Sequence, residues 1–278
     1  MGWFSRYKKK PENQMAEKKE LWYVCPSCTA HIYREEWEKN LKVCSKCNFH
    51  ERLTCWERID MLIDEGTAVE LNPSVTTTDP LNFSDAKGSY ADKAKEVKEN
   101  TGLKESVVAV SGQLKSRNVI LAVMDFRFLG GSLGSGSGER ILLAAEYALL
   151  RKRPFIIVSA SGGARMHEGI VSLMQMAKTC AGISRLRKAG LPYISILTDP
   201  TMGGVSASYA MVGDLNIAEP GALVGFAGRR VIEQTIKQEL PKDFQTAEYL
   251  VEHGFMDRIV SRTDMKEFLA NIFKYWNK

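Results

Sequence analysis

Hydrophobic and polar positions follow two different periods along the chain, and each period predicts a type of element. Apolar residues recur at helical spacing from Trp56 to Ile63, which predicts a helix that Gly66 ends. Residues 72–105 are mainly polar and predict a surface connector that contains a helix. Short apolar runs between 107 and 124 then predict two strands joined as a hairpin.

The pattern next repeats a strand–loop–helix unit. A β-branched run at 155–158 leads through a Gly-Gly loop into a helix at 166–188, and a strand at 193–197 leads through a second Gly-Gly loop into a helix at 205–211. Two successive units predict an α/β fold, a right-handed β–β–α spiral with helices along one side. Further elements are expected at 139–151, 215–217, 223–224, 230–238, 247–253 and in a last amphipathic helix that ends at Trp276.

Composition is that of a globular protein. Of the 278 residues 44% are hydrophobic and 26% are charged, which is enough for one large domain and a small appendage. No apolar run is long enough to cross a bilayer, and the basic start (1–20) is not followed by an apolar stretch. We therefore expect a soluble, cytoplasmic protein without a membrane partner. The net charge of +5 permits binding of polyanions but does not require it.

Four cysteines in two C-x2-C pairs, separated by fifteen residues, predict a small metal-binding ribbon over 21–55. Four thiolates without an open position are typical of structural zinc, one ion per chain, and fit it better than an iron–sulfur cluster. The predicted ligands are Cys25, Cys28, Cys44 and Cys47. His31 and His50 are expected at the surface, and Cys55 and Cys180 as buried small side chains.

Two interpretations of the ribbon's function remain open. Basic residues flank the cysteines and favour weak binding of nucleic acid: Lys39, Lys42, Lys46 and Arg52. Aromatic residues are also present and would alternatively pack a small core around the metal: Trp22, Tyr23, Tyr33 and Trp37.

The two Gly-Gly loops, at 162–163 and 203–204, place backbone N–H groups at helix N-termini, where they can hold a phosphate or an oxyanion. A tight turn is the alternative for either loop. The glycine-rich stretch at 130–138 fails the dinucleotide-binding pattern, and the chain has no P-loop motif. This stretch either lines the path of a ligand or is a flexible connection.

Side chains for acid–base catalysis are few. Glu168 is either a general base or a charge that stabilises a helix N-terminus. Ser206 and Ser208 with His167 as base would make a self-compartmentalising serine peptidase, but no orienting aspartate is evident and the ribbon would stay unexplained.

The segments 159–168 (SASGGARMHE) and 198–208 (TDPTMGGVSAS) closely resemble signatures of biotin-dependent carboxyltransferases. Together with the ribbon and NIAEP at 216–220, the chain resembles the β subunits of bacterial acetyl-CoA carboxylase over 22–260. The resemblance implies a crotonase-like fold over 106–278, preceded by the ribbon (21–55) and a helical connector (56–105). It also implies an α2β2 assembly with a separate α subunit, and a biotin carboxylase and biotin carboxyl carrier protein as partners.

The reaction implied by this resemblance moves a carboxyl group from carboxybiotin to acetyl-CoA and gives malonyl-CoA, the first committed step of fatty acid synthesis. Biotin's own ureido group would take the proton, so that no side-chain base is required. By motif, Gly203 and Gly204 would form an oxyanion hole, and Gly162 and Gly163 would shape the acyl-CoA pocket. The loop with Gly130 and Gly131 would also bind substrate. Two positions depart from the expected motif, His167 in place of Gln and Arg229 in place of Pro.

Overall fold

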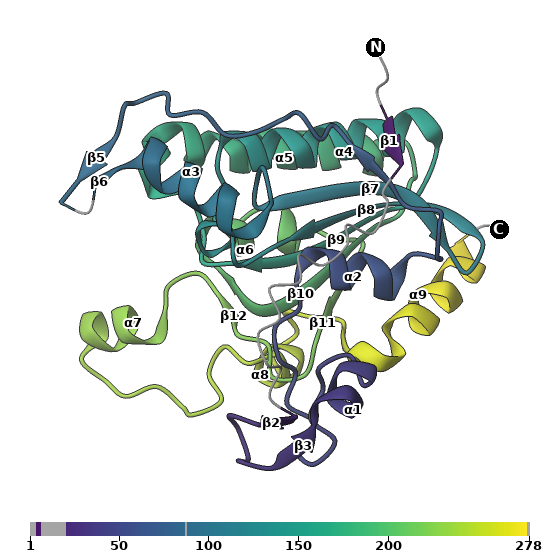
Figure 1. The fold of residues 1–278 in the computed structure, drawn as a ribbon, viewed down its shortest axis with the longest axis vertical. Helices are drawn as coiled ribbons and strands as arrows, with labels where there is room; N and C mark the ends of the chain where they lie inside the picture. The colour runs from purple at the N-terminus through teal and green to yellow at the C-terminus, as the bar shows by residue number, and fades with distance from the viewer. Residues whose placement is uncertain (1–3, 7–20, 87, 277–278) are drawn as a thin grey trace.

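The computed structural model describes residues 4–6, 21–86 and 88–276, so most of the basic segment 1–20 lies outside the described residues. Its centre is a nine-stranded sheet with the order β1-β4-β7-β8-β9-β10-β11-β13, in which β12 pairs with β10 (Figure 1). The strands are β1 (Phe4–Arg6), β4 (Val69–Leu71), β7 (Val107–Leu114), β8 (Arg117–Met124), β9 (Phe155–Ser161), β10 (Tyr193–Met202), β11 (Leu215–Ala218), β12 (Val224–Gly225) and β13 (Arg258–Ile259).

The predicted hairpin is present as β7 and β8, and the strands from β8 through β9 and β10 to β11 and β13 are parallel. Lys115 and Ser116 form the hairpin turn, and both have positive φ, as a two-residue turn that matches the strand twist requires. Polar residues such as Gln113 pair with β8, so both strands are longer than their apolar runs indicate.

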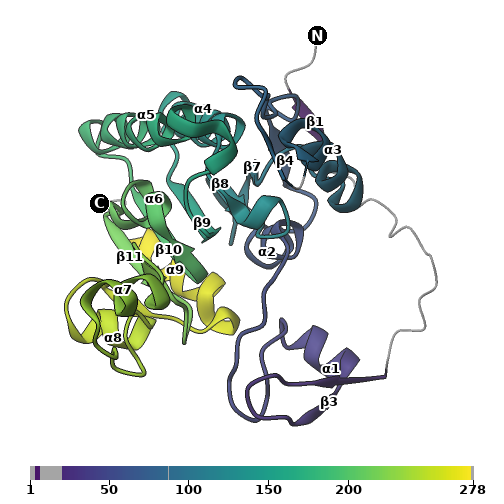
Figure 2. The same ribbon diagram turned by 90° about the vertical axis from the view of Figure 1, so that its left-hand side faces the viewer.

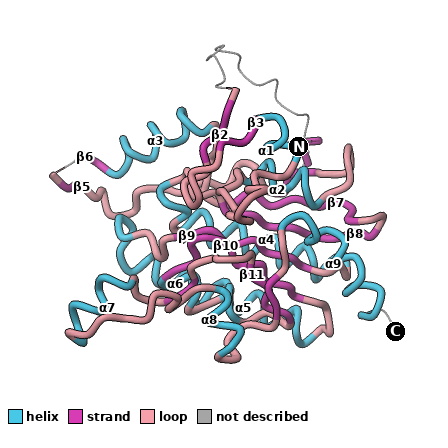
Figure 3. The backbone as a smooth tube through the Cα atoms, turned by 90° about the horizontal axis from the view of Figure 1, so that it is seen from below, coloured by secondary structure: helices cyan, strands magenta, loops and turns pink. Residues whose placement is uncertain are grey.

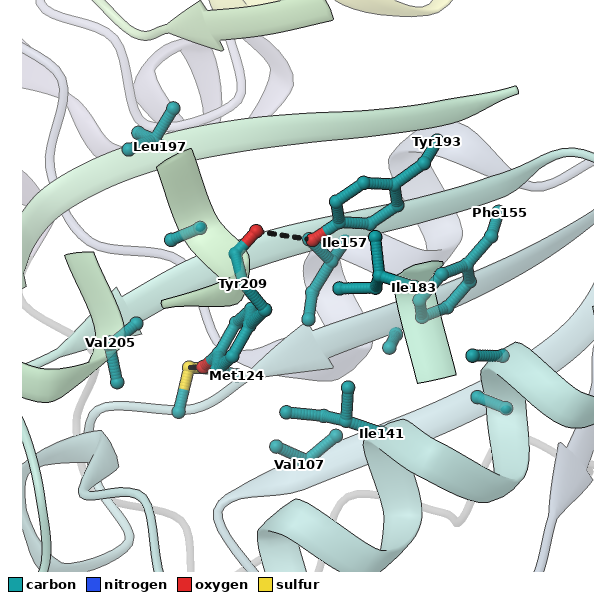
Figure 4. Packing of buried hydrophobic residues seen from close by; sticks show 14 of the residues in the cluster. Val107, Met124, Ile141, Phe155, Ile157, Ile183, Tyr193, Leu197, Val205 and Tyr209 are labelled. Atoms are coloured by element: carbon teal, nitrogen blue, oxygen red, sulfur yellow. Dashed lines mark hydrogen bonds between the residues drawn. The ribbon is translucent and has the colours of Figure 1, made fainter. Parts of the chain in front are cut away.

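Helices cover both faces of the sheet. α4 (Ser135–Arg151) and α5 (Gly169–Lys188) pack with Phe155 and Ile157 on one face, where the Tyr193 hydroxyl also donates to the carbonyl of Tyr209 at 2.7 Å (Figure 4). α2 (Cys55–Leu62) and α9 (Arg262–Trp276) pack on the opposite face with the alternate residues of β9. The expectation of helices along one side is therefore correct only for α4 and α5.

The remaining elements are short, and the helices expected at 205–211, 230–238 and 247–253 are each shorter than predicted. They are α1 (Arg34–Lys39), α3 (Tyr90–Thr101), α6 (Gly203–Ser206), α7 (Arg229–Ile236), α8 (Ala247–Glu252), β2 (Trp22–Val24), β3 (His31–Tyr33), β5 (Ser84–Asp85), β6 (Gly88–Ser89) and 3-10 turns at Leu129–Gly131, Met166–Glu168 and Tyr209–Met211. The helix expected at 166–188 is interrupted at Gly169, where φ is 49° and ψ is −129°. The helix expected at 205–211 is interrupted at Ser208, because the backbone conformation of this residue is also not helical.

α2 ends at Leu62 and not at Gly66. The carboxylate of Asp64 accepts from the N–H groups of Lys115 and Ser116, and its own N–H donates to Gln113. These bonds draw the chain onto the β7–β8 turn and stop the helix. Because β4 and α2 pack on the sheet, the connector is part of the same body.

The ribbon is a mostly irregular segment around β2, β3 and α1 (Figure 3). None of the helices in the described part of the chain has the length and apolar character needed to cross a bilayer.

Candidate active site and metal site

The two Gly-Gly loops lie against each other at the carboxyl ends of β9 and β10. Ser161 and Thr201 are partners in the sheet, and the loops follow directly from them. A Cβ atom on Gly203 would lie 3.1 Å from the Cα of Gly163, and φ of Gly203 is +61°. Only glycine fits such an approach without displacement of the backbone.

The third glycine pair joins the same place. The N–H of Gly162 donates to the carbonyl of Gly130 at 2.9 Å. A Cβ atom on Gly131 would lie 1.9 Å from the carbonyl oxygen of Ala160, so this position also requires glycine. The structure thus brings together the six glycines that the sequence singles out in three separate loops.

The N–H groups of these loops are not equivalent. Gly162 donates to Gly130, Gly163 to the Ser161 hydroxyl at 3.0 Å, and Gly203 to the carbonyl of Phe226 at 3.0 Å. Gly204 is the second residue of α6, where a helix provides no acceptor for the N–H group. Of the predicted pair, Gly204 therefore keeps an N–H group without an acceptor in the helix, whereas the N–H of Gly203 is bonded within the turn.

The rest of the glycine-rich stretch packs against the interior. Residues 135–138 form the first turn of α4, which is not a flexible connection. A Cβ atom on Gly136 would lie 2.4 Å from a carboxylate oxygen of Glu105, and one on Gly138 would lie 2.3 Å from the amide oxygen of Gln175. These glycines allow close packing of α4.

Glu168 belongs to a buried ionic network. Its carboxylate accepts from the Tyr90 hydroxyl at 2.7 Å, from the N–H of Ser135 at 2.6 Å and from Thr77. Arg165 lies between it and Glu105, at 3.2 Å and 2.5 Å, and all three side chains are buried. Burial raises the pKa of Glu168, but these hydrogen bonds and the arginine outweigh burial, so the pKa is lowered.

A carboxylate held in this way is a poor general base. It stabilises the N-terminus of α4, and not that of the helix that follows Glu168 in sequence. Sequence reasoning missed Arg165 and Glu105 because charged residues are usually exposed.

The side chains required for a serine peptidase are not together. His167 stacks on Tyr90 with ring centroids 5.0 Å apart. The hydroxyls of Ser206 and Ser208 donate to backbone carbonyls at 2.7 Å and 2.6 Å. No serine–histidine hydrogen bond links these residues, which removes the basis for the peptidase alternative.

The four predicted metal ligands form one cluster. All four sulfur atoms lie within 4.8 Å of one another. The Sγ atoms of Cys25 and Cys47 are 3.6 Å apart, and those of Cys28 and Cys44 are 3.7 Å apart. This set can hold a metal ion.

Two of the four histidine and cysteine residues whose exposure was predicted, His31, His50, Cys55 and Cys180, differ from expectation. His31 is exposed and Cys55 is buried, as predicted. His50 is buried and not at the surface, because its Nδ1 lies 2.8 Å from the carbonyl of Asn48 and its Nε2 accepts from a backbone N–H of the spiral. Cys180 is only half-buried.

Tyr23 and Trp37 pack in a small core of the ribbon, where their rings stack with centroids 3.9 Å apart, but Trp22 is exposed. Two of its basic residues are paired. Lys42 lies 2.6 Å from Glu57, and Arg52 lies 3.1 Å from Asp199.

Comparison with known proteins identifies the family of the chain. The carboxyl transferase domain matches residues 48–268. The acetyl-coenzyme A carboxylase carboxyl transferase subunit beta of Clostridium novyi is 53% identical over 254 residues, 91% of this chain and 87% of the relative. That of Pedobacter heparinus is 49% identical and covers 99% of both chains. The chain belongs to this family of carboxyltransferase β subunits.

Solved structures agree on the crotonase-like carboxyltransferase fold. Transcarboxylase 12S, solved with methylmalonyl-coenzyme A bound, is 26% identical with a TM-score of 0.67, and the match covers 86% of this chain but 42% of that one. A Pseudomonas malonate decarboxylase hetero-tetramer has a TM-score of 0.61 at 23% identity, which shows the fold alone. The chain spans less than half of the longer transcarboxylase chain.

Proposed function

We propose that this carboxyltransferase β subunit transfers the carboxyl group of carboxybiotin, presented by a biotin carboxyl carrier protein, to acetyl-CoA to give malonyl-CoA. The observation that carries the proposal is the meeting of three glycine loops at the carboxyl ends of β9 and β10. This arrangement offers the backbone amide of Gly204, and no side-chain base, at the place where the reaction would occur.

The chemistry requires stabilisation of negative charge more than proton transfer by the protein. Loss of a proton from the acetyl methyl group develops charge on the thioester oxygen, and the N–H of Gly204 at the start of α6 is positioned to hold such an oxygen. Biotin's ureido group accepts the proton. Glu168 and His167 lie outside the glycine loops, which agrees with a reaction in which no side chain of the protein takes the proton.

The other glycines serve the approach of the substrate. At Gly130 a Cβ atom would meet nothing within 4 Å, so this backbone borders open space. At Gly162 it would meet only the carbonyl of Gly130, at 3.6 Å. Together with Gly131 and Gly163, these residues form the acyl-CoA pocket.

The metal in the ribbon is zinc, one structural ion per chain. Four thiolates at the usual zinc–sulfur distance of about 2.3 Å in tetrahedral geometry have sulfur atoms about 3.8 Å apart. The Sγ separations of 3.6 and 3.7 Å agree with this geometry. With four protein ligands the ion has no open position for catalysis.

An α subunit completes the enzyme as an α2β2 tetramer. A biotin carboxylase supplies this tetramer with carboxybiotin on the carrier protein. The support is an apolar face on both sides of the glycine loops, made of Met166, Ile170, Leu173, Met174, Phe226, Val231 and Ile236, all exposed. Figure 2 shows α5, α6 and α7 one below another on this side.

α7 in particular requires a partner. It is eight residues long and has no buried residue, although Val231 and Ile236 give it an apolar side. A helix of this length is marginal alone and gains its stability when the apolar side is covered. An exposed face of this kind marks a protein interface.

Binding of nucleic acid by the ribbon is a weaker proposal, because Lys42 and Arg52 are paired with carboxylates. We place the enzyme in the cytoplasm, where its charged CoA substrates are retained and its free thiols stay reduced.

The test is biotin-dependent decarboxylation of malonyl-CoA, the reverse reaction, by the zinc-loaded chain alone and with the α subunit of the same cell. We expect activity in the mixture only. No activity in an assembled, zinc-loaded mixture would overturn the proposal and favour the nucleic-acid alternative, which predicts binding that weakens steeply with salt.

A further inference from the structure

Glu219, in the NIAEP segment, lies at the centre of a buried ionic cluster that the proposed chemistry does not use. One carboxylate oxygen accepts from Arg58 at 2.5 Å and from Arg262 at 2.9 Å. The other accepts from the same two residues at 2.9 Å and 2.8 Å. All three side chains are at least 95% buried. We call these three residues the arginine–glutamate triad.

The triad joins parts of the chain that are far apart in sequence. Arg58 lies in α2, Glu219 directly after β11, and Arg262 at the start of α9. Arg262 also reaches the ribbon, because its Nη1 donates to the carbonyl of Leu41 at 2.7 Å and its backbone N–H donates to Nε2 of His50 at 3.3 Å. Two contacts of the ribbon with the spiral thus run through Arg262, and the one to Leu41 depends on how Glu219 orients its guanidinium group.

The triad is sensitive to loss of its one negative charge. Two guanidinium groups share a single carboxylate in a buried place, and each makes two charge-assisted hydrogen bonds to it. Removal of the carboxylate charge leaves two buried cations side by side, which is strongly unfavourable. The guanidinium of Arg262 would then turn away from its present position.

The ribbon forms one wall of a cavity of about 680 Å³. Asn48, Phe49 and Arg52 line it from the ribbon, and Ala160 and Thr198 line it from the ends of β9 and β10. The triad lies in its lining as well. Ala160 lies two residues before the first Gly-Gly loop, so this part of the lining is close in sequence to the glycines.

We infer that Glu219 is a positioning residue that fixes the ribbon as an immobile wall of this cavity, so that the ribbon is a brace and does not open and close as a lid. The inference on the fixed ribbon stands on the triad alone. Its kinetic consequence, that the wall sets the affinity for substrate, rests on the proposed function.

The experiment compares Glu219→Gln and Arg262→Lys with a matched control, Glu267→Gln, which removes a carboxylate from an exposed pair with Lys115. Arg262→Lys keeps the charge but loses the planar fork, and so tests the triad if Glu219→Gln folds poorly. Amide hydrogen exchange of residues 41–53 is measured on the zinc-loaded chain, together with zinc content. The KM and kcat for malonyl-CoA are measured in the assembled enzyme.

We expect at least tenfold faster exchange over 41–53 in both triad variants, with zinc retained and no change in the control. In the assembled enzyme we expect at least a fivefold higher KM and a kcat within about twofold. Unchanged exchange at 41–53 in both variants would overturn the inference. An inactive wild-type mixture would count against the proposed function, and the exchange result would still decide whether the triad holds the ribbon.

Discussion

The Cα of Gly163 lies so close to Gly203 that a Cβ atom on Gly203 would come within 3.1 Å of it. Each residue belongs to a different strand–loop–helix unit, and the two units are neighbours because β9 pairs with β10. The contact of two bare backbones fixes the start of α6, and with it the direction of the Gly204 amide.

Gly203→Ala therefore should reduce activity although it removes no side chain. The added methyl meets Gly163, and φ of +61° is unfavourable for alanine, so the turn before Gly204 must shift. Loss of one oxyanion donor typically lowers kcat by about 10² to 10³. The matched control is Gly228→Ala, where a Cβ atom would meet nothing within 4 Å. Full activity of Gly203→Ala in the assembled enzyme would exclude the proposed role of this turn.

The ribbon should depend on its metal. Cys44→Ser removes a buried ligand, and we expect loss of bound zinc and unfolding of the ribbon, because a structural zinc site supplies the folding free energy of so small a unit. Cys180→Ser, outside the cluster, should keep one zinc per chain. Metal analysis and hydrogen exchange of the ribbon measure both effects. Equal zinc in the two variants would contradict the four-cysteine assignment.

Most of the fold could be predicted because its signals are local. The β-branched run of β9 and the repeated Gly-Gly loops each lie within a few consecutive residues. The spacing of the four cysteines likewise identified the four-sulfur cluster that the structure brings together.

The interior ionic clusters could not be predicted. Arg165 with Glu105, and Glu219 with Arg262, are separated by 40 or more residues, as the hydrogen bonds between them show. Nothing in the local pattern distinguishes these buried charges from solvated ones. The sequence also could not show which glycine N–H groups are already hydrogen-bonded, because the N–H of Gly203 donates to the carbonyl of Phe226, in a later segment.

Stability should fall in acid through these clusters. The pKa of Glu168 is lowered in the folded chain, because the hydrogen bonds and Arg165 outweigh burial. A carboxyl with a lowered folded pKa contributes stability that is complete above its unfolded pKa, about 4.3, and is lost as the pH falls through the folded value. We expect the free energy of unfolding to decrease below about pH 5.

Glu168→Gln tests the origin of that decrease. It leaves Arg165 with one of its two carboxylates, and we expect it to lose about 3 kcal/mol at pH 7. Because glutamine does not titrate, the variant should show a shallower pH dependence than wild type between about pH 5 and 3. Denaturant unfolding at several pH values measures both quantities. A parallel pH dependence in the two proteins would assign the acid sensitivity to other carboxylates.

The apolar face should control assembly with the α subunit. Ile236 lies on α7 and Ile170 near the start of α5, on the two sides of the glycine loops, and both are exposed. Ile236→Asp and Ile170→Asp place a charge where a partner would exclude water, and burial of an unpaired charge is costly. We expect each to weaken the complex at least tenfold, with the isolated chain as stable as wild type.

Leu150→Asp is the matched control for these variants. Leu150 is also exposed, but it lies at the far end of the α4–α5 pair, because the two helices run side by side with Glu139 next to Lys178 and Glu146 next to Arg185. Sedimentation of each variant with the α subunit, and decarboxylation of malonyl-CoA, are the measurements. If Leu150→Asp weakens the complex and the two isoleucine variants do not, the α subunit docks on another side of the chain, and α7 requires a different partner to cover its apolar side.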